Sequence, residues 1–487
     1  MLCVFKRLTL HDVIKIPVRY KNPPHHWSIL RKKKSASQKA LEHFDSLYPD
    51  IYGDLWQNIR SALLVENRNY IAVVNNYSDT KRICEDLENL GAINVKSIFD
   101  INRANSKVER VKEDIDNLNK NEDLISIDNG IDNSSYSNEE NHLNEELKDL
   151  NEPFKGFPLQ SIEKDIHIQN DNRIIKSSVG ISASQLFEFI PPSQIKGMDD
   201  FVFESDQYIN YNKGADFSIK IEEEQNFNFP DMLFLYTFDN EDNERFPMPK
   251  MGSTGVIDYF VVDSASILPV LSLDLQPGDK VLDMCAAPGG KALIALQTMI
   301  PEMIVANDLQ QSRVKRIKYF YKSFVSNFED SNNKFIITQG DARLLNDKNI
   351  YNKILVDVPC TTDRHTLHED DNNIFKSSRL KERLKLPEIQ TEILVNALKL
   401  VTCGGTVVYS TCTLNPIQND GVVQMALKTV YEECNSTFVV KDQAPSLYPL
   451  HYLYEFANCG LRYGHIAVPT KTKNKGPLYF CKMIKVQ

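Results

Sequence analysis

The sequence predicts an α/β fold in which helices cover both faces of a parallel β-sheet. Two observations support this prediction. After residue 256, short apolar or β-branched runs alternate with stretches of helical periodicity, as in successive βαβ units. Three of these runs end in acidic or small residues just before a helix, and ligands bind at this edge of such sheets.

Each element is expected from its own pattern. The predicted strands are Lys280–Met284, Met303–Asn307, Lys334–Thr338, Lys353–Val358 and Gly405–Ser410. The predicted helices between them cover residues 291–299, 310–325 and 387–400. We therefore expect one catalytic domain over residues 256–487.

The preceding part of the chain divides by composition. Residues 36–103 are expected to fold as an N-terminal extension, with helices at Ala40–Tyr48 and Leu55–Leu64 and a strand at Tyr70–Val74. Residues 104–180 are rich in Asn, Asp, Glu and Ser, and we expect a disordered insertion without a function of its own. Residues 181–255 regain aromatic residues, which favours a linker with a small α+β element.

Composition excludes several classes of protein. The 487 residues contain 42% hydrophobic residues but no apolar run long enough to span a membrane, so no membrane partner is expected. Nine cysteines at irregular spacing form neither a disulfide framework nor a zinc motif, so we expect reduced thiols, an intracellular compartment and no metal site.

Charge is unevenly distributed along the chain. Residues 1–35 contain nine Lys or Arg but only one acid, Asp12, and no continuous apolar segment, which favours a mitochondrial targeting segment and a matrix location. The alternative is a basic arm that touches RNA or stays solvated. The acids concentrate around residues 109–150, so the net charge of −10 does not exclude a nucleic-acid partner.

The segment from Val281 to Lys291 predicts a nucleotide-type cofactor site. A strand runs into small residues at 286–290 and then into a helix, which lets the backbone approach a ligand closely. Asp308 ends the next strand, where an acid can bind both hydroxyls of a ribose, and Asp341 ends the third, where it can bind an adenine amino group. The alternatives are a plain connecting turn and acids that only cap helices.

Two cysteines follow the last two predicted strands. Cys360 follows Asp357, and Cys412 ends the run Ser410-Thr411-Cys412, so neighbouring strands should bring both thiols beside the cofactor. A lone buried cysteine is usually a small apolar residue. A thiolate that adds to C6 of cytosine, however, makes C5 nucleophilic enough to accept a methyl group, and a second group must then help to release the product. Asp357 could stabilise the adduct by hydrogen bonding.

These motifs together resemble the Sun-domain (Fmu-like) RNA cytosine-5 methyltransferases. The resemblance implies a Rossmann-like methyltransferase domain, Cys412 as the nucleophile and Cys360 as the residue that assists product release. It also implies S-adenosylmethionine as the cofactor. The residues implied to bind it are Cys285, Ala286, Ala287, Pro288, Gly289, Gly290, Lys291, Asp308, Arg313, Asp341 and Asp357.

Further segments resemble the mitochondrial ribosomal-RNA subgroup of that family. They include Asp363-Arg364-His365, Gly53-Asp54-Leu55-Trp56 and the closing run from Gly476 to Met483. The resemblance implies a helical mTERF-type protein partner, ribosomal RNA as substrate and a role in ribosome assembly. Two alternatives remain: a transfer-RNA or messenger-RNA methyltransferase of the same family, and an assembly factor whose binding matters more than its catalysis. The acidic insertion is longer than the family pattern requires.

Two basic clusters could neutralise RNA phosphates. The first comprises Arg313, Lys315, Arg316, Lys318 and Lys322, and the second comprises Lys376, Arg379, Lys381, Arg383 and Lys385. The second is the favoured one, because it follows the Pro-Cys motif, where a substrate strand must pass. The alternative for each is an ordinary solvated helix face.

Overall fold

The computed structural model describes residues 34–66, 69–105, 219–226, 228–238, 246–325, 334–347 and 349–487. The predicted targeting segment falls outside these residues except for its last two positions. The predicted disordered insertion falls outside them from residue 106 onward. Both stay predictions.

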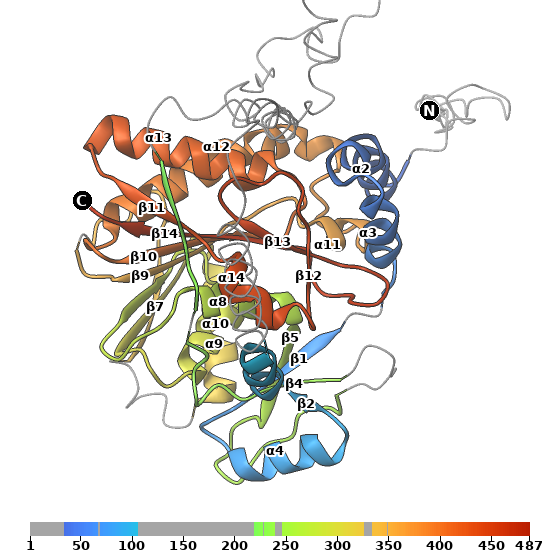
Figure 1. Cartoon of the computed structure of the whole chain (residues 1–487), viewed down its shortest axis with the longest axis vertical. Helices are drawn as coiled ribbons and strands as arrows, with labels where there is room; N and C mark the ends of the chain where they lie inside the picture. Colours follow the sequence, from blue (N-terminus) through green and yellow to red (C-terminus); the bar gives the residue numbers. More distant parts are fainter. Residues whose placement is uncertain are drawn as a thin grey trace, which may run out of the picture.

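A ten-stranded sheet forms the centre of the molecule (Figure 1). Its parallel part has the order β10-β9-β6-β7-β8, with β6 at Lys280–Asp283, β7 at Met303–Asp308, β8 at Phe335–Gln339, β9 at Lys353–Asp357 and β10 at Thr406–Thr411. These five strands confirm the predicted parallel strands to within two residues at each end. Runs such as Val281-Leu282 and Ile354-Leu355 are buried on alternate faces, which is why the strands are continuously apolar.

An antiparallel part, which the sequence reading did not predict, extends this sheet. β14 (Leu478–Lys485) pairs with β10 and then with β13 (His465–Val468) and β11 (Phe438–Asp442). β12 (Glu455–Phe456) pairs with β13, and β3 (Lys220–Glu223) pairs with β11. β3, which precedes the parallel strands in the chain, therefore extends the sheet beyond β11.

Helices cover both faces, as predicted. One face carries α8 (Leu268–Ser272), α9 (Gly290–Gln297) and α10 (Gln311–Phe324). The other carries α11 (Asp363–His368), α12 (Leu380–Leu400) and α13 (Val422–Cys434). Helix α12 begins seven residues earlier than predicted, because Pro387 lies inside its first two turns without ending it.

The N-terminal part packs onto this domain at two places. Helices α2 (Ala36–Tyr52) and α3 (Leu55–Leu63) lie beside α11 and share its core (Figure 1). A separate antiparallel sheet has the order β2-β4-β1-β5, with β1 at Tyr70–Val74, β2 at Ile93–Asn94, β4 at Leu235–Thr237 and β5 at Tyr259–Asp263, and α4 (Thr80–Asn89) covers it. β5 belongs to this small sheet although it follows the domain boundary predicted at residue 256, because its partner β1 lies far upstream.

Short elements complete the fold. They are the 3-10 helices at Ser264–Ile267, Ser377–Arg379 and Tyr448–Leu450, the π-helix at Ile417–Gly421 and α14 (Ala444–Leu447). Among the described residues, the helices are too short or too polar to cross a lipid bilayer.

Candidate active site

The loop between β6 and α9 is built for close approach of a ligand to the backbone. Gly289 has a φ of 112°, and a Cβ there would lie 3.4 Å from the ring of Phe320, so this position requires glycine. The backbone N–H of Ala286 donates to the carbonyl of Asn307 at 2.8 Å, which ties the loop to the end of β7. The predicted residues from Cys285 to Lys291 therefore form the loop at the carboxyl edge of the sheet and the first two residues of α9.

The side chain of Asn307 holds the neighbouring strand ends together. Its Nδ2 atom donates to the carbonyl oxygens of Met284 and Gly340, each at 3.0 Å, and its side chain is fully buried. The sequence analysis did not single out Asn307. Only its position immediately before Asp308, the acid predicted to bind the ribose, indicated that Asn307 could lie in the site.

Asp308 and Arg313 lie beside the same loop. Asp308 is 2% exposed, and its carboxylate lies 3.4 Å from the backbone nitrogen of Ala287 and accepts from the N–H of Gln310. Arg313 reaches back from α10 to the carbonyl of Ala287 at 3.1 Å and to Asp308 at 3.4 Å. Both predicted side chains thus meet at the cofactor loop, and Asp308 bonds to the N–H of the N-cap residue Gln310 without capping α10 itself.

Asp341 lies at the third strand end, as expected, but it faces an arginine in this structure. Arg343 forms an ion pair with it at 2.7 Å, and this hydrogen bond lowers the pKa of the Asp341 carboxyl. Arg343 also pairs with Glu392, so the three side chains form a chain of charges at the edge of the sheet.

Asp357 lies at the centre of the polar site. Its two carboxylate oxygens accept from Lys291 Nζ at 2.7 Å and from Ser410 Oγ at 2.8 Å. Burial would lower the pKa of Lys291, but the neighbouring Asp357 carboxylate raises it, so the lysine stays charged. The ion pair fixes Asp357 between the cofactor loop and the end of β10.

Asp283 lies deeper in the same site, at the end of β6. It is 1% exposed, and its two oxygens accept no hydrogen bond of ordinary geometry from the described residues. Burial and then the charge of Asp357 raise the pKa of Asp283 to about 8.

The two predicted cysteines are in contact. β9 and β10 are parallel neighbours with Asp357 opposite Ser410, so the residues that follow each strand come together. The Sγ atoms of Cys360 and Cys412 lie 3.3 Å apart. Cys360 is buried and Cys412 is partly exposed, so Cys412 is the more accessible thiol. The contact with Cys360, then burial, raise the pKa of Cys412 well above its usual value, and Lys291 opposes that shift.

A buried carboxylate, Asp363, fixes the loops that carry both cysteines. It accepts from the hydroxyls of Thr361 and Thr413 at 2.7 Å and 2.8 Å and from the backbone N–H of Leu414 at 2.8 Å. Thr361 and Thr413 directly follow the two cysteines in sequence. Tyr48 of α2 donates a further hydrogen bond to Asp363 at 2.7 Å. The sequence analysis noted Asp363 only as part of a resemblance, and nothing in its spacing indicated this bridging position.

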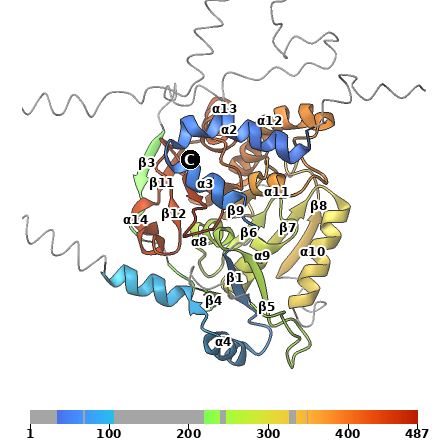
Figure 2. The same cartoon turned by 90° about the vertical axis from the view of Figure 1, so that its right-hand side faces the viewer.

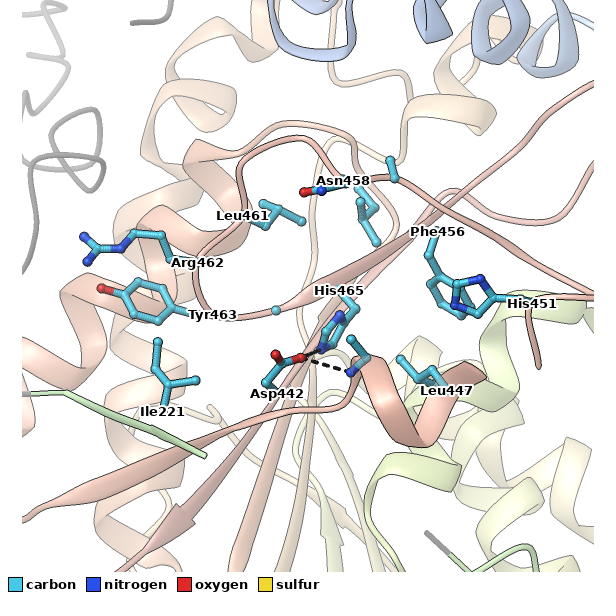
Figure 3. A pocket seen from close by; sticks show the side chains of 14 residues that line it. Ile221, Asp442, Leu447, His451, Phe456, Asn458, Leu461, Arg462, Tyr463 and His465 are labelled. Carbon is cyan, nitrogen blue, oxygen red and sulfur yellow. Dashed lines mark hydrogen bonds and ion pairs between the residues drawn. The ribbon is translucent and has the colours of Figure 1, made fainter. Parts of the chain in front are cut away.

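A separate pocket of ≈ 350 Å³ lies where β11 and β13 adjoin along β14 (Figure 3). Inside it, His465 Nε2 lies 3.3 Å from a carboxylate oxygen of Asp442 and accepts from the backbone N–H of Gln443, and His451 packs against Phe456. No predicted site residue lines this pocket. The described residues also contain no group of three or more His, Cys, Asp or Glu side chains placed to hold a metal ion.

Comparisons with known proteins identify related sequences over the whole chain. Residues 270–451 match the family described as 16S rRNA methyltransferase RsmB/F. A 5-cytosine rRNA methyltransferase NSUN4 from Xenopus laevis is 33% identical over 466 residues, which cover 95% of this chain and 93% of the relative. A mitochondrial tRNA (cytosine(34)-C(5))-methyltransferase from Danio rerio is 34% identical over 258 residues, 52% of this chain and 67% of the relative.

Solved structures are more distant. The crystal structure of NSun6 from Pyrococcus horikoshii with SFG superposes with a TM-score of 0.37 at 23% identity and covers 47% of this chain and 54% of its own.

Proposed function

Because the chain belongs to the RsmB/F family of RNA cytosine-5 methyltransferases, we propose that it methylates C5 of a cytosine in mitochondrial small-subunit ribosomal RNA. Cys412 is the proposed nucleophile. The observation that carries this proposal is the 3.3 Å contact between the Sγ atoms of Cys412 and Cys360, beside the pair formed by Lys291 and Asp357. Two thiols in contact at one strand edge suit a reaction that needs one group to attack and another to resolve the adduct.

The enzyme uses S-adenosylmethionine, which supplies an electrophilic methyl group when bound. The residues at the cofactor loop fit this group. Gly289 keeps the loop free of a side chain, Asp308 lies beside the backbone of Ala287, and Asp283 presents a buried carboxylate without an ordinary hydrogen bond. The residues proposed to hold the cofactor are 285–291, Asp308, Arg313, Asp341 and Asp357.

The reaction is proposed to begin at Cys412. Its Sγ atom gives its proton to solvent and, as the thiolate, adds to C6 of the target cytosine; the S–C6 bond forms, the electron pair of the C5=C6 double bond moves toward C4 and N3, and C5 becomes nucleophilic as in an enamine. Lys291 holds Asp357 in place, and the Asp357 carboxylate accepts a hydrogen bond from the exocyclic amine of the ring, while the Lys291 ammonium group offsets the negative charge that develops on the N3 side. The base must leave its stack to reach Cys412.

Product release is assigned to Cys360. After C5 has accepted the methyl group, its proton must be removed, the C5=C6 double bond re-forms and the S–C6 bond breaks. The Sγ atom of Cys360 lies 3.3 Å from that of Cys412, so it is placed to take part in this proton transfer. If Cys360 acts only after methyl transfer, a variant without this thiol should fail to resolve the covalent adduct, and the adduct should accumulate.

The substrate assignment is tested by bisulfite sequencing of cellular RNA after depletion of the protein. We expect loss of a single methylated cytosine in mitochondrial small-subunit ribosomal RNA, restored by the parental protein and not by Cys412→Ala. Loss of a methylated cytosine in a transfer RNA would instead support the alternative substrate, which is the class of RNA in the name of the Danio rerio relative. If Cys412→Ala restores ribosome assembly without the methyl group, binding is the essential role.

The N-terminal segment and the partner also belong to this proposal. Residues 1–35 are proposed to direct the protein to the mitochondrial matrix, and a helical mTERF-type protein is proposed to deliver it to ribosomal RNA. The basic composition of the segment supports the first, and the family resemblance supports the second.

A further inference from the structure

The exposed face of helix α10 carries a continuous positive charge. The helix contains Arg313, Lys315, Arg316, Lys318 and Lys322, and none of its 14 residues is acidic. Its opposite face consists of Val314, Ile317, Tyr321 and Phe324, which are buried against the sheet. The helix thus has one face for packing and one that is cationic along its whole length.

Three of these cations have no role within the described part of the chain. Arg313 bonds to the cofactor loop. Lys315, Arg316 and Lys318 are exposed and form neither an ion pair nor a hydrogen bond with any described residue. Three uncompensated charges within one turn repel one another, which stabilises neither the helix nor the fold.

The other basic cluster is used differently. Arg379 is held by Glu382 at 2.5 Å and by the side chain of Asn372, and the guanidinium of Arg383 lies over the ring of Phe375 at 4.4 Å. Lys39 donates to Ser377 in the same region. Two arginines of the second cluster are thus engaged within the chain, whereas Lys315, Arg316 and Lys318 of α10 are not, and RNA binding by the second cluster stays a prediction.

Tyr319 adds an aromatic ring to the cationic face. It is 78% exposed and lies one helical turn from Lys315 and Arg316. A base can stack on an exposed ring while the flanking cations bind its phosphates, which is how proteins bind single-stranded nucleic acid. Contacts among the described residues give no structural reason for leaving so large an aromatic ring exposed to solvent.

The face leads away from the active site. Helix α10 begins where Gln310 bonds to Asp308, and it lies on the outside of the sheet beside β7 and β8 (Figure 2). From Ser312 to Lys322 it extends about 15 Å at ~1.5 Å per residue.

We propose that the exposed face of α10, formed by Lys315, Arg316, Lys318 and Tyr319, binds the single-stranded RNA that flanks the target cytosine. The phosphates lie along the lysine and arginine side chains, and one base stacks on Tyr319. This inference rests on the proposed RNA methyltransferase function and extends it by assigning the path of the substrate strand.

The test measures binding of a fluorescein-labelled, cytosine-containing single-stranded RNA of about 20 nucleotides to the full chain, by anisotropy at several salt concentrations. Lys315→Ala/Arg316→Ala should reduce the slope of log affinity against log salt by about 1.4, since each phosphate contact contributes ~0.7 for single strands. Tyr319→Ala should weaken binding by about 5- to 150-fold, as expected for one lost stack, and Tyr319→Phe should bind like the parental protein.

Matched controls lie on the helices of the other face. Lys399→Ala and Tyr431→Ala alter a cation and an exposed ring on α12 and α13, and both should leave the affinity and the salt slope unchanged. S-adenosylmethionine affinity should be unchanged in every variant, and at saturating RNA the rate of cytosine methylation should equal that of the parental protein.

Parental affinity and slope in the α10 variants would overturn the proposal, as would loss of binding to a protein partner with RNA binding intact. Failure of the proposed function would look different, because the parental protein itself would then methylate no cytosine at saturating RNA.

Discussion

At the scale of single residues, Asp363 connects the two halves of the catalytic site. One carboxylate bonds to the residue after each cysteine and to Tyr48 of the N-terminal helix. Burial raises the pKa of Asp363, while the hydrogen bonds it accepts oppose that shift. Its contribution is to hold the relative position of Cys360 and Cys412 without touching either.

Replacing Asp363 should therefore damage both stability and catalysis. Asp363→Ala leaves several buried donors without an acceptor, and we expect about 2–4 kcal/mol loss in the free energy of unfolding. It should lower kcat by at least about 10-fold under conditions where the variant is folded, because the thiols lose their alignment. Urea unfolding and single-turnover kinetics measure the two effects. Tyr48→Phe, which removes one donor, should cost only about 1 kcal/mol; an unchanged kcat in folded Asp363→Ala would refute the positioning role.

A second effect at the scale of single residues follows from the pKa of Cys412, which should determine how the rate of adduct formation depends on pH. Its pKa is raised by contact with Cys360 and by burial, so the thiol is neutral near pH 7 and only the thiolate attacks. The rate of adduct formation should therefore rise with pH, by up to ~10-fold per unit between about pH 6.5 and 8.5. Rapid-quench measurement at saturating RNA checks this, and a flat or falling profile would contradict it.

At the scale of elements, sequence patterns predicted the parallel strands and the cofactor loop because these depend on local composition. β6 and β9 are runs of apolar residues, and Gly289 occupies the one loop position with a strongly positive φ. The pairing of β5 with β1 depends instead on chain separated by more than 180 residues, which periodicity cannot register. The same holds for β3, which joins the sheet edge at β11.

The end of β6 should make stability depend on pH. The pKa of Asp283 is raised from its ordinary value near 4 to about 8 in the folded protein, so the folded state binds more protons than the unfolded state between these values. The free energy of unfolding should fall as pH rises from about 4 to about 8, by at most ~1.4 kcal/mol per unit from this group. Chemical unfolding at several pH values, without cofactor, should show a weaker decline in Asp283→Asn, and equal slopes in both proteins would contradict the assignment.

At the scale of the whole molecule, the N-terminal helices are part of the site's support. Tyr52 of α2 donates to the carbonyl of Leu414, two residues after Cys412, at 2.7 Å. Trp56 lies 2% exposed in the same core as α11 and α12. The sequence placed these residues in an extension and could not show that they contact the catalytic loops, since such contacts join residues more than 300 positions apart.

The residues of the candidate site also divide into those that local sequence patterns indicate and those that only long-range contacts reveal. Its chemistry-bearing residues could be found at strand ends from sequence, because parallel strands bring their carboxyl ends to one edge. The residues that position these side chains could not be found from sequence, because Asn307 and Asp363 act through buried hydrogen bonds between distant segments.

The division of labour between the two cysteines is the central claim, and trapping of the RNA adduct tests it most directly. Cys360→Ala, incubated with S-adenosylmethionine and substrate RNA, should accumulate a protein–RNA species that survives denaturing gel electrophoresis. The same species should be absent from Cys412→Ala and from the double variant. Turnover without any accumulated adduct in Cys360→Ala, or an adduct that persists in Cys412→Ala, would contradict the account.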